Sequence, residues 1–229
     1  DVQVLYAVGA TSVILSAAND ADIKVLNMYS RSPKAFCMYS KDESISSPAD
    51  LRGKTIAGPV GTNLHELLAA YLATADMTVD DVNFVNMGIP EAKAGLEGGS
   101  VDVALLAGAA AYQTQQQGYH LITDGEGLIN AIIAVAVTNK FYEAHPEIIE
   151  KLQSAQAEIA DFMQNHEQEA YEMAAAELDL DVDAVKEMAQ HYDFSTEITA
   201  ADKDGFQRTA DFMYQAGMIE KELDVNTLF

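Results

Sequence analysis

The stretch GPVGTNLHELL, residues 58–68, combines residue types that suit the binding of an anion at the start of a helix. The first N–H groups of a helix have no partner within it, and the helix dipole places positive potential beside them. Such a start holds anions without lysine or arginine. Gly61 allows a turn and a close approach of the backbone, while Thr62 and Asn63 add a hydroxyl and an amide. The stretch predicts a ligand-binding corner, and the alternative is that Thr62 or Asn63 only caps its own helix.

Two further corners have a similar composition. Residues 9–12 read Gly-Ala-Thr-Ser, with Thr11 and Ser12 as polar donors. Residues 107–110 read Ala-Gly-Ala-Ala and offer backbone N–H groups and space, but no polar side chain. In α/β sheets, ligands gather at the carboxyl ends of the strands, where such corners lie. The predicted ligand-binding residues are Gly9, Ala10, Thr11, Ser12, Gly61, Thr62, Asn63, His65, Ala107, Gly108 and Ala109.

His65 lies one turn into the helix that follows the first corner, and three roles are open to it. As a cation it would help to hold an anion, as a neutral ring it would form a hydrogen bond, and otherwise it packs beside Glu66. The remaining histidines show no pairing at metal-ligand spacing; they are His120, His145, His166 and His191. We therefore predict neither a metal nor a cofactor.

No catalytic motif is evident in the sequence. Residues 58–68 lack the Lys-Ser/Thr pair of a phosphate loop, no G-x-G-x-x-G follows a strand, and no G-x-S-x-G is present. The single cysteine, Cys37, lies in the apolar run KAFCMYS without a nearby base, so we expect a small buried hydrophobic residue. We predict no catalytic residue and do not expect an enzyme.

The composition excludes several partners. The 229 residues include 13 Lys+Arg and 36 Asp+Glu, a formal net charge of −23, which disfavours nucleic acid and anionic lipid surfaces. A hydrophobic content of 49% is that of a folded globular chain. No run approaches the roughly 20 apolar residues of a membrane span. The chain begins within a strand-like segment and without an export signal, so we expect its beginning to have been processed or removed.

An internal repeat predicts two similar α/β lobes. DVQVLYAVGATS (residues 1–12) is similar to SVDVALLAGAAA (residues 100–111), with Gly9 aligned to Gly108. In each segment, the pattern predicts a strand, a glycine at its end, a helix and a second strand. The alternation of strands and helices predicts mostly parallel sheets with right-handed crossovers. From Pro146 onward the pattern is almost wholly helical.

Three longer stretches resemble a known family. They are SPADLRGKTIAGPVGTNLHELLAAYL, VNFVNMGIPEAKAGLEGGSVDVALLAG and VAVTNKFYEAHPEIIEKL, which include D-L-x-G-K and F-x-x-x-H-P-E. Together they resemble the periplasmic substrate-binding proteins of ABC importers, in the branch that serves nitrate, aliphatic sulfonates, taurine and thiamine precursors. The resemblance runs through most of the chain.

The resemblance implies a type II periplasmic binding protein-like fold, with two α/β lobes around a cleft and two crossing segments. The crossings are expected near residues 33–39 and 133–138. Lobe one would then hold residues 1–35 and 138–229, including the helical C-terminal part, and lobe two residues 36–137. The three corners would face the ligand.

The resemblance also implies where this chain departs from the family. Family members begin with a further strand, helix and strand, so lobe one is expected to be incomplete, with an open sheet edge that can pair with another chain. In the sulfonate binders the third corner often carries large aromatic or polar groups, whereas Ala107, Gly108 and Ala109 are small. The ligand therefore stays open among sulfonates, taurine, nitrate and pyrimidine precursors.

The sequence thus favours a non-enzymatic receptor that closes its lobes on a small anionic or zwitterionic molecule. The resemblance implies that it is exported, periplasmic or lipid-anchored at the cell surface, and that it delivers its ligand to a membrane permease. One alternative is an enzyme on the same fold, from thiamine-pyrimidine or menaquinone biosynthesis. Another is the effector-sensing lobe pair of a transcription regulator, which would need a helix-turn-helix segment upstream.

Overall fold

The computed structural model describes residues 2–229, and the chain forms two units. The first unit contains the residues up to Arg31 together with Ile132–Asp211 and Ile219–Phe229. The second contains Ser32–Ala131 and the short segment Phe212–Met218. The chain therefore passes from the first unit into the second after Arg31 and returns after Ala131.

Strands and helices follow one another along the described residues. The strands are β1 (Val4–Gly9), β2 (Ile23–Arg31), β3 (Phe36–Ser40), β4 (Thr55–Gly58), β5 (Asn83–Asn86), β6 (Val103–Ala107), β7 (His120–Asp124) and β8 (Ile132–Thr138). The helices are α1 (Ala10–Ala18), α2 (Asn63–Ala73), α3 (Ile89–Gly98), α4 (Gly108–Gln116), α5 (Asn139–Ala144), α6 (Pro146–Asn165), α7 (Glu167–Leu178), α8 (Val182–Ala189) and α9 (Ala200–Gln215). The series α6 to α9 confirms the predicted helical C-terminal part.

The chain changes unit after Arg31 and again after Ala131. Both points lie a few residues before the boundaries expected after residues 35 and 137. At the first, the Ser32 N–H donates to the Ala131 carbonyl and the Pro33 carbonyl accepts from Gly125, so these residues belong with the second unit. At the second, β8 pairs with β1 and β2 from Ile132 onward, which places the whole strand in the first unit.

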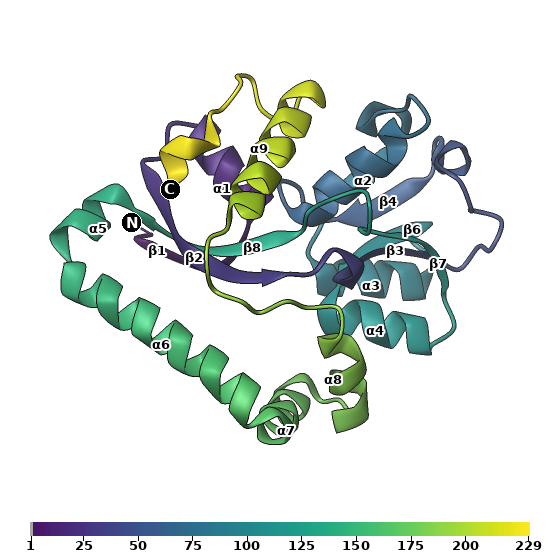
Figure 1. Cartoon of the computed structure of the whole chain (residues 1–229). Coiled ribbons are helices and arrows are strands. Elements are labelled where there is room, and N and C mark those ends of the chain that lie inside the picture. The colour runs from purple at the N-terminus through teal and green to yellow at the C-terminus, as the bar shows by residue number, and fades with distance from the viewer. Residues whose placement is uncertain (1) are drawn as a thin grey trace. The chain divides into compact units, whose positions relative to one another are not determined.

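Each unit is built on a sheet in which one strand runs against the others (Figure 1). The first unit has the order β1-β8-β2, with β8 antiparallel to both neighbours. The second has the order β5-β4-β6-β3-β7, in which β4 is parallel to β5 and β6 while β3 is antiparallel to β6 and β7. Most strands of each sheet therefore share one direction, as predicted, although every pairing made by β3 or β8 is antiparallel.

The topology confirms the internal repeat. The first segment forms β1, α1 and β2, and the second forms β6, α4 and β7. In each case a strand from a distant part of the chain, β8 or β3, lies between the two repeat strands. That inserted strand is the first strand the chain forms on entering the unit.

Alternating side chains of β6 supply both faces of the five-stranded sheet. Val103 and Leu105 point into a core with four leucines of α2, whereas Ala104 and Leu106 point into a core with α3 and α4. This period of two is that of a strand buried on both sides.

The three-stranded sheet has its own apolar contacts with the helices that follow β8. Leu26 of β2 and Val135 and Val137 of β8 pack with Phe141 of α5 and Ile149 of α6. In Figure 1, α6 runs on the side of this sheet away from α1. The long helix α6 therefore forms a layer of its own against β2 and β8.

The segment between α8 and α9, residues 190–199, is called the strap because it runs along the outer edge of β2. The Met28 N–H donates to the Thr196 carbonyl at 3.0 Å, and Arg31 and Asp193 exchange two backbone hydrogen bonds of 2.9 Å. The strap thereby gives β2 the partner that the sheet lacks on that side.

Arg31 fixes the strap and the start of α9 to the end of β2. Its Nε and Nη2 donate to the two carboxylate oxygens of Asp202 at 2.6 and 2.7 Å, and its Nη1 donates to the Ser195 carbonyl at 2.8 Å. The Asp202 side chain is only 3% exposed. Burial by itself would raise the pKa of Asp202, but hydrogen bonds from Arg31 and Thr199 hold it below its usual range.

We expect Arg31→Ala to lower the free energy of unfolding by about 3–5 kcal/mol at pH 7, because the Asp202 carboxylate would stay buried without its partner. Urea denaturation followed by circular dichroism measures this. The matched control is Arg52→Ala, which removes an exposed ion pair with Asp81 and should cost far less, because solvent screens that pair.

The pH dependence provides a second check. Asp202 has a lowered pKa in the folded state, so its contribution is present above the unfolded value of about 4 and is lost as the pH falls through the folded value. The gap between the wild type and Arg31→Ala should therefore narrow below about pH 4. Equal losses for the two arginine variants at pH 7 would contradict the assignment.

Candidate functional site

Three strand ends of the second unit meet at one edge of its sheet. β4 lies between β5 and β6 and is parallel to both, with Gly58 opposite Asn86. Because neighbouring parallel strands end at the same edge, the corners that follow them are neighbours too. The structure therefore brings together two of the predicted corners, Gly61–His65 before and within α2 and Ala107–Ala109 at the start of α4.

A third corner at this edge was not predicted. It follows β5 and leads through Gly88, the N-cap residue, into α3. The Asn86 carboxamide oxygen accepts a hydrogen bond from the Val60 N–H at 3.1 Å, which ties this corner to the one after β4. The available sequence signal is a glycine shortly before Pro90, a pattern typical of a helix start, which does not show what lies beside the corner.

The helices at these corners begin without a side-chain cap. The N-cap residues of α1, α2, α3 and α4 are Gly9, Thr62, Gly88 and Ala107, and none of them forms a side-chain capping hydrogen bond. The Thr62 hydroxyl donates instead to the Pro59 carbonyl at 2.9 Å. The Thr62 side chain therefore does not cap its own helix, which leaves Asn63 from the alternative drawn from the sequence.

Two of the corner glycines have a backbone that requires glycine. Gly61 has φ +74° and Gly108 has φ +58°, both in the left-handed region that other residues rarely adopt. The backbone conformation of the turns therefore explains why glycine occupies these two positions.

The predicted site residues differ in unit and in exposure. Gly9–Ser12 belong to the first unit, and the other predicted residues belong to the second. Thr11 and Asn63 are 0 and 2% exposed, so the hydroxyl and the amide expected as ligand donors are enclosed by protein. Ala10 and Gly61 are also buried, whereas the half-buried residues are Gly9, Ser12, Thr62, His65, Ala107, Gly108 and Ala109.

His65 has the character of a neutral ring. Its Nδ1 accepts a hydrogen bond from the Gly61 N–H at 3.2 Å, and the ring centroid lies 5.1 Å from that of Phe84. Burial lowers its pKa below the ordinary value. An Nδ1 that accepts leaves the proton on Nε2, so among the three roles open to His65 the structure supports that of a neutral, hydrogen-bonding side chain.

We expect the stability of the wild type to fall as the pH is lowered below about 6.5, because the unfolded chain takes up a proton at His65 more readily than the folded chain. His65→Gln should flatten this part of the profile, measured by urea denaturation between pH 5 and pH 7. His191→Gln, at an exposed position, is the control and should keep the slope. A histidine resonance for His65 that titrates at or above the ordinary value would refute this.

Other reactive groups do not assemble into a centre. Within residues 2–229, no three His, Cys, Asp or Glu side chains are placed to share a metal ion. Burial raises the pKa of the Cys37 thiol to about 12, and its Sγ donates to the Lys34 carbonyl at 3.4 Å. Over the same residues, no helix is long and apolar enough to cross a membrane.

Two α/β units, each with strand-end corners and one inserted antiparallel strand, define a protein with the type II periplasmic binding protein fold. A family model described as NMT1/THI5 like matches residues 5–170. The chain belongs to the NMT1/THI5-like family.

Three similar proteins show how this family and fold are used elsewhere. A Bacillus subtilis (strain 168) protein named for the binding of aliphatic sulfonates is 25% identical over 222 residues, which are 95% of this chain and 67% of that protein. The alkanesulfonate-binding protein SsuA from Xanthomonas axonopodis pv. citri, solved with MOPS, has a TM-score of 0.87 at 20% identity and covers 98% of this chain and 79% of its own. The desulfurization enzyme DszB has a TM-score of 0.72 at 16% identity over 98% of this chain and 82% of its own.

Proposed function

We propose that this protein is the solute-binding receptor of an ABC importer and that it captures a small anionic or zwitterionic molecule, with sulfonates as the first candidates. The observation that carries the proposal is the set of uncapped helix starts at neighbouring strand ends of the second unit. The sulfonate-binding names of the similar proteins support the same ligand class.

The ligand would be held by backbone amides and small residues. In this proposal Gly61, Thr62, His65 and Ala107–Ala109 contribute from the second unit, and the corner at residues 9–12 contributes from the first. In the proposed hinge mechanism, a bound ligand favours the closed population over the open one, which is how binding would be signalled to a permease.

The net charge of −23 does not prevent the capture of an anion. Salt reduces the reach of exposed charges to about 8 Å at physiological ionic strength. Partial positive charges at a helix start act within the first turn, at the distance of direct contact. A neutral His65 fits this picture, since it can donate one hydrogen bond from Nε2 without adding charge.

The enzyme alternative has less support. DszB shows that the fold also serves catalysis. In this chain, the candidate for a nucleophilic thiol is Cys37, its single cysteine. A buried thiol with a pKa raised to about 12 supplies almost no thiolate at neutral pH. The similar proteins named as binding proteins fit a receptor better.

Calorimetry with ethanesulfonate and taurine tests the proposal, with Ala109→Asp and Ala109→Asn as matched variants. An acidic side chain in the first turn of α4 is favourable for the helix, so Ala109→Asp should fold. Its carboxylate would compete with an anionic ligand and weaken binding roughly tenfold or more relative to the isosteric Asn variant.

Two results would count against the proposal. Absence of binding heat with sulfonates, taurine, nitrate and pyrimidine precursors would remove the receptor function. Equal affinities for the Asp and Asn variants would leave the receptor but remove the α4 corner from its site.

We further propose that the protein is exported, acts in the periplasm or anchored at the cell surface, and delivers its ligand to a membrane permease. The similar proteins support this assignment because they include periplasmic binding proteins of sulfonates. Export of a tagged full-length gene product, followed by cell fractionation, tests it.

We also propose self-association through the outer edge of β1, which is an edge strand of the three-stranded sheet. The Gln3 carbonyl accepts a hydrogen bond from the Thr138 N–H of β8. Because successive residues of a strand direct their N–H and C=O groups to opposite sides, those of Val4 point away from the sheet. Val2 and Tyr6 are exposed beside them. A bulge between Leu5 and Val8 limits the length available for pairing.

Light scattering measures this association. We expect a larger dimer fraction in 1 M NaCl than in dilute buffer, because salt screens the repulsion between two chains of charge −23. Val4→Pro removes an outward N–H without touching the β8 ladder and should remain monomeric. A monomer at every salt and protein concentration would rule this contact out.

A further inference from the structure

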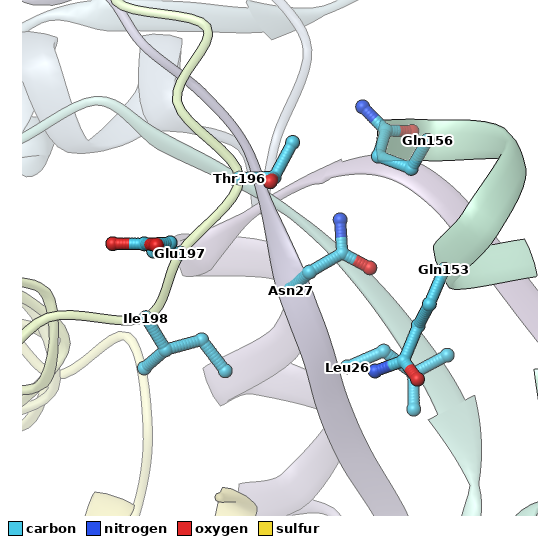
Figure 2. A pocket seen from close by; sticks show the side chains of 7 residues that line it. All are labelled: Leu26, Asn27, Gln153, Gln156, Thr196, Glu197 and Ile198. Atoms are coloured by element: carbon cyan, nitrogen blue, oxygen red, sulfur yellow. The ribbon is translucent and has the colours of Figure 1, made fainter. Parts of the chain in front are cut away.

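The first unit contains a cavity that the proposed receptor site does not use. It has a volume of about 260 Å³ and lies between β2, α6 and the strap. Figure 2 shows its lining, in which Asn27, Gln156 and Thr196 border the same space from these three elements. The other lining residues are Leu26, Gln153, Glu197 and Ile198.

Gln156 presents a hydrogen-bond donor to this cavity. The side chain is on α6 and is 6% exposed, and its Oε1 accepts a hydrogen bond from the Tyr6 hydroxyl. With the Tyr6 hydroxyl as the donor to Oε1, Nε2 is the end of the carboxamide that is left for another partner. In the part of the chain that the structure describes, no group accepts a hydrogen bond from Gln156 Nε2. Among the described residues, Ser32 Oγ is the buried side-chain polar atom without a partner, so Gln156 Nε2 keeps contact with solvent in the cavity. An acceptor of a ligand could take the place of water at this donor.

Asn27 and Thr196 add complementary groups. Asn27 Nδ2 donates to the Met28 carbonyl at 2.9 Å, which leaves Oδ1 as the acceptor of this carboxamide. The Thr196 hydroxyl can donate and accept, and the Thr196 backbone is held beside β2 because its carbonyl accepts from the Met28 N–H. The cavity thus combines a donor, an acceptor and a hydroxyl, with Leu26 and Ile198 as apolar walls.

The charge of the lining restricts the ligand. Among the described residues, no lysine, arginine or histidine borders the cavity, so it lacks the groups that would pair with a sulfonate or phosphate. The only charged lining residue, Glu197, is exposed and therefore well solvated. Carboxamides and hydroxyls with apolar walls match an uncharged molecule that carries several hydroxyl groups. The volume is below the range of drug-sized pockets, which begins at roughly 300 Å³.

We propose that this cavity is a second binding site, for a small uncharged polyol. It is separate from the strand-end corners, because Asn27 lies within β2 and opposite Val135 of β8, rather than at a strand end. All lining residues belong to the first unit, so the site does not depend on closure of the two units or on the identity of the proposed receptor ligand.

Titration of the ¹⁵N-labelled full chain with xylitol, followed by two-dimensional NMR, tests this site. Saturable shifts are expected for the side-chain amides of Gln156 and Asn27 and for the backbone of residues 26–28. Gln156→Met keeps the length of the side chain but removes the amide, and should raise the dissociation constant roughly two- to tenfold. Gln164→Met, at an exposed position of the same helix, is the matched control and should bind as the wild type does.

A second variant guards against misfolding. If Gln156→Met loses its native spectrum, Thr196→Val tests the same site from the strap, with the same expected weakening. Shifts that stay linear in xylitol, or that spread over both units, would overturn the proposal. So would tight binding of tetramethylammonium in place of xylitol, because the ligand would then be a cation. The calorimetric test with sulfonates is independent of this titration, so an absence of xylitol binding would not contradict the proposed receptor function.

Discussion

The fold depends on the two strands that the chain inserts each time it changes unit. β8 lies between β1 and β2, and these two repeat strands make no direct pairing in the sheet order. The same holds for β3 between β6 and β7. The residues Ala134–Val137 are at most 1% exposed, as expected for a strand covered on both faces. The first sheet is therefore complete only after the chain has left the unit, formed the second sheet and returned, a non-local pairing that is slow to form.

The same insertion determines what the strand ends can do. Because the antiparallel strands occupy inner positions, the parallel neighbours β5, β4 and β6 lie at one side of the second sheet with their carboxyl ends together. Three helix starts then share one edge, and none of their N-cap side chains forms a capping hydrogen bond. In a chain with 36 acidic and 13 basic residues, such backbone sites provide positive potential where cationic side chains are scarce.

The strap links the stability of the first unit to its cavity. The carbonyl oxygens of Ser195 and Glu197 accept hydrogen bonds from the Arg31 guanidinium, which also donates to the Asp202 carboxylate. Between them, Thr196 is bonded to Met28 and borders the cavity. A change at Arg31 would therefore alter the position of Thr196 as well as the ion pair.

The sequence by itself determined the local features: the repeat, the apolar strands, the helical C-terminal part and the glycine corners, because periodicity and backbone conformation are encoded within a few residues. The family resemblance added the two-unit fold. Only the tertiary structure decided the order of the strands, the neutral state of His65 and the enclosure of Thr11 and Asn63. It also decided the cavity, since Asn27, Gln156 and Thr196 are far apart in the chain and meet only through long-range packing. Charge states and cavities depend on burial, and burial is a property of the assembled fold.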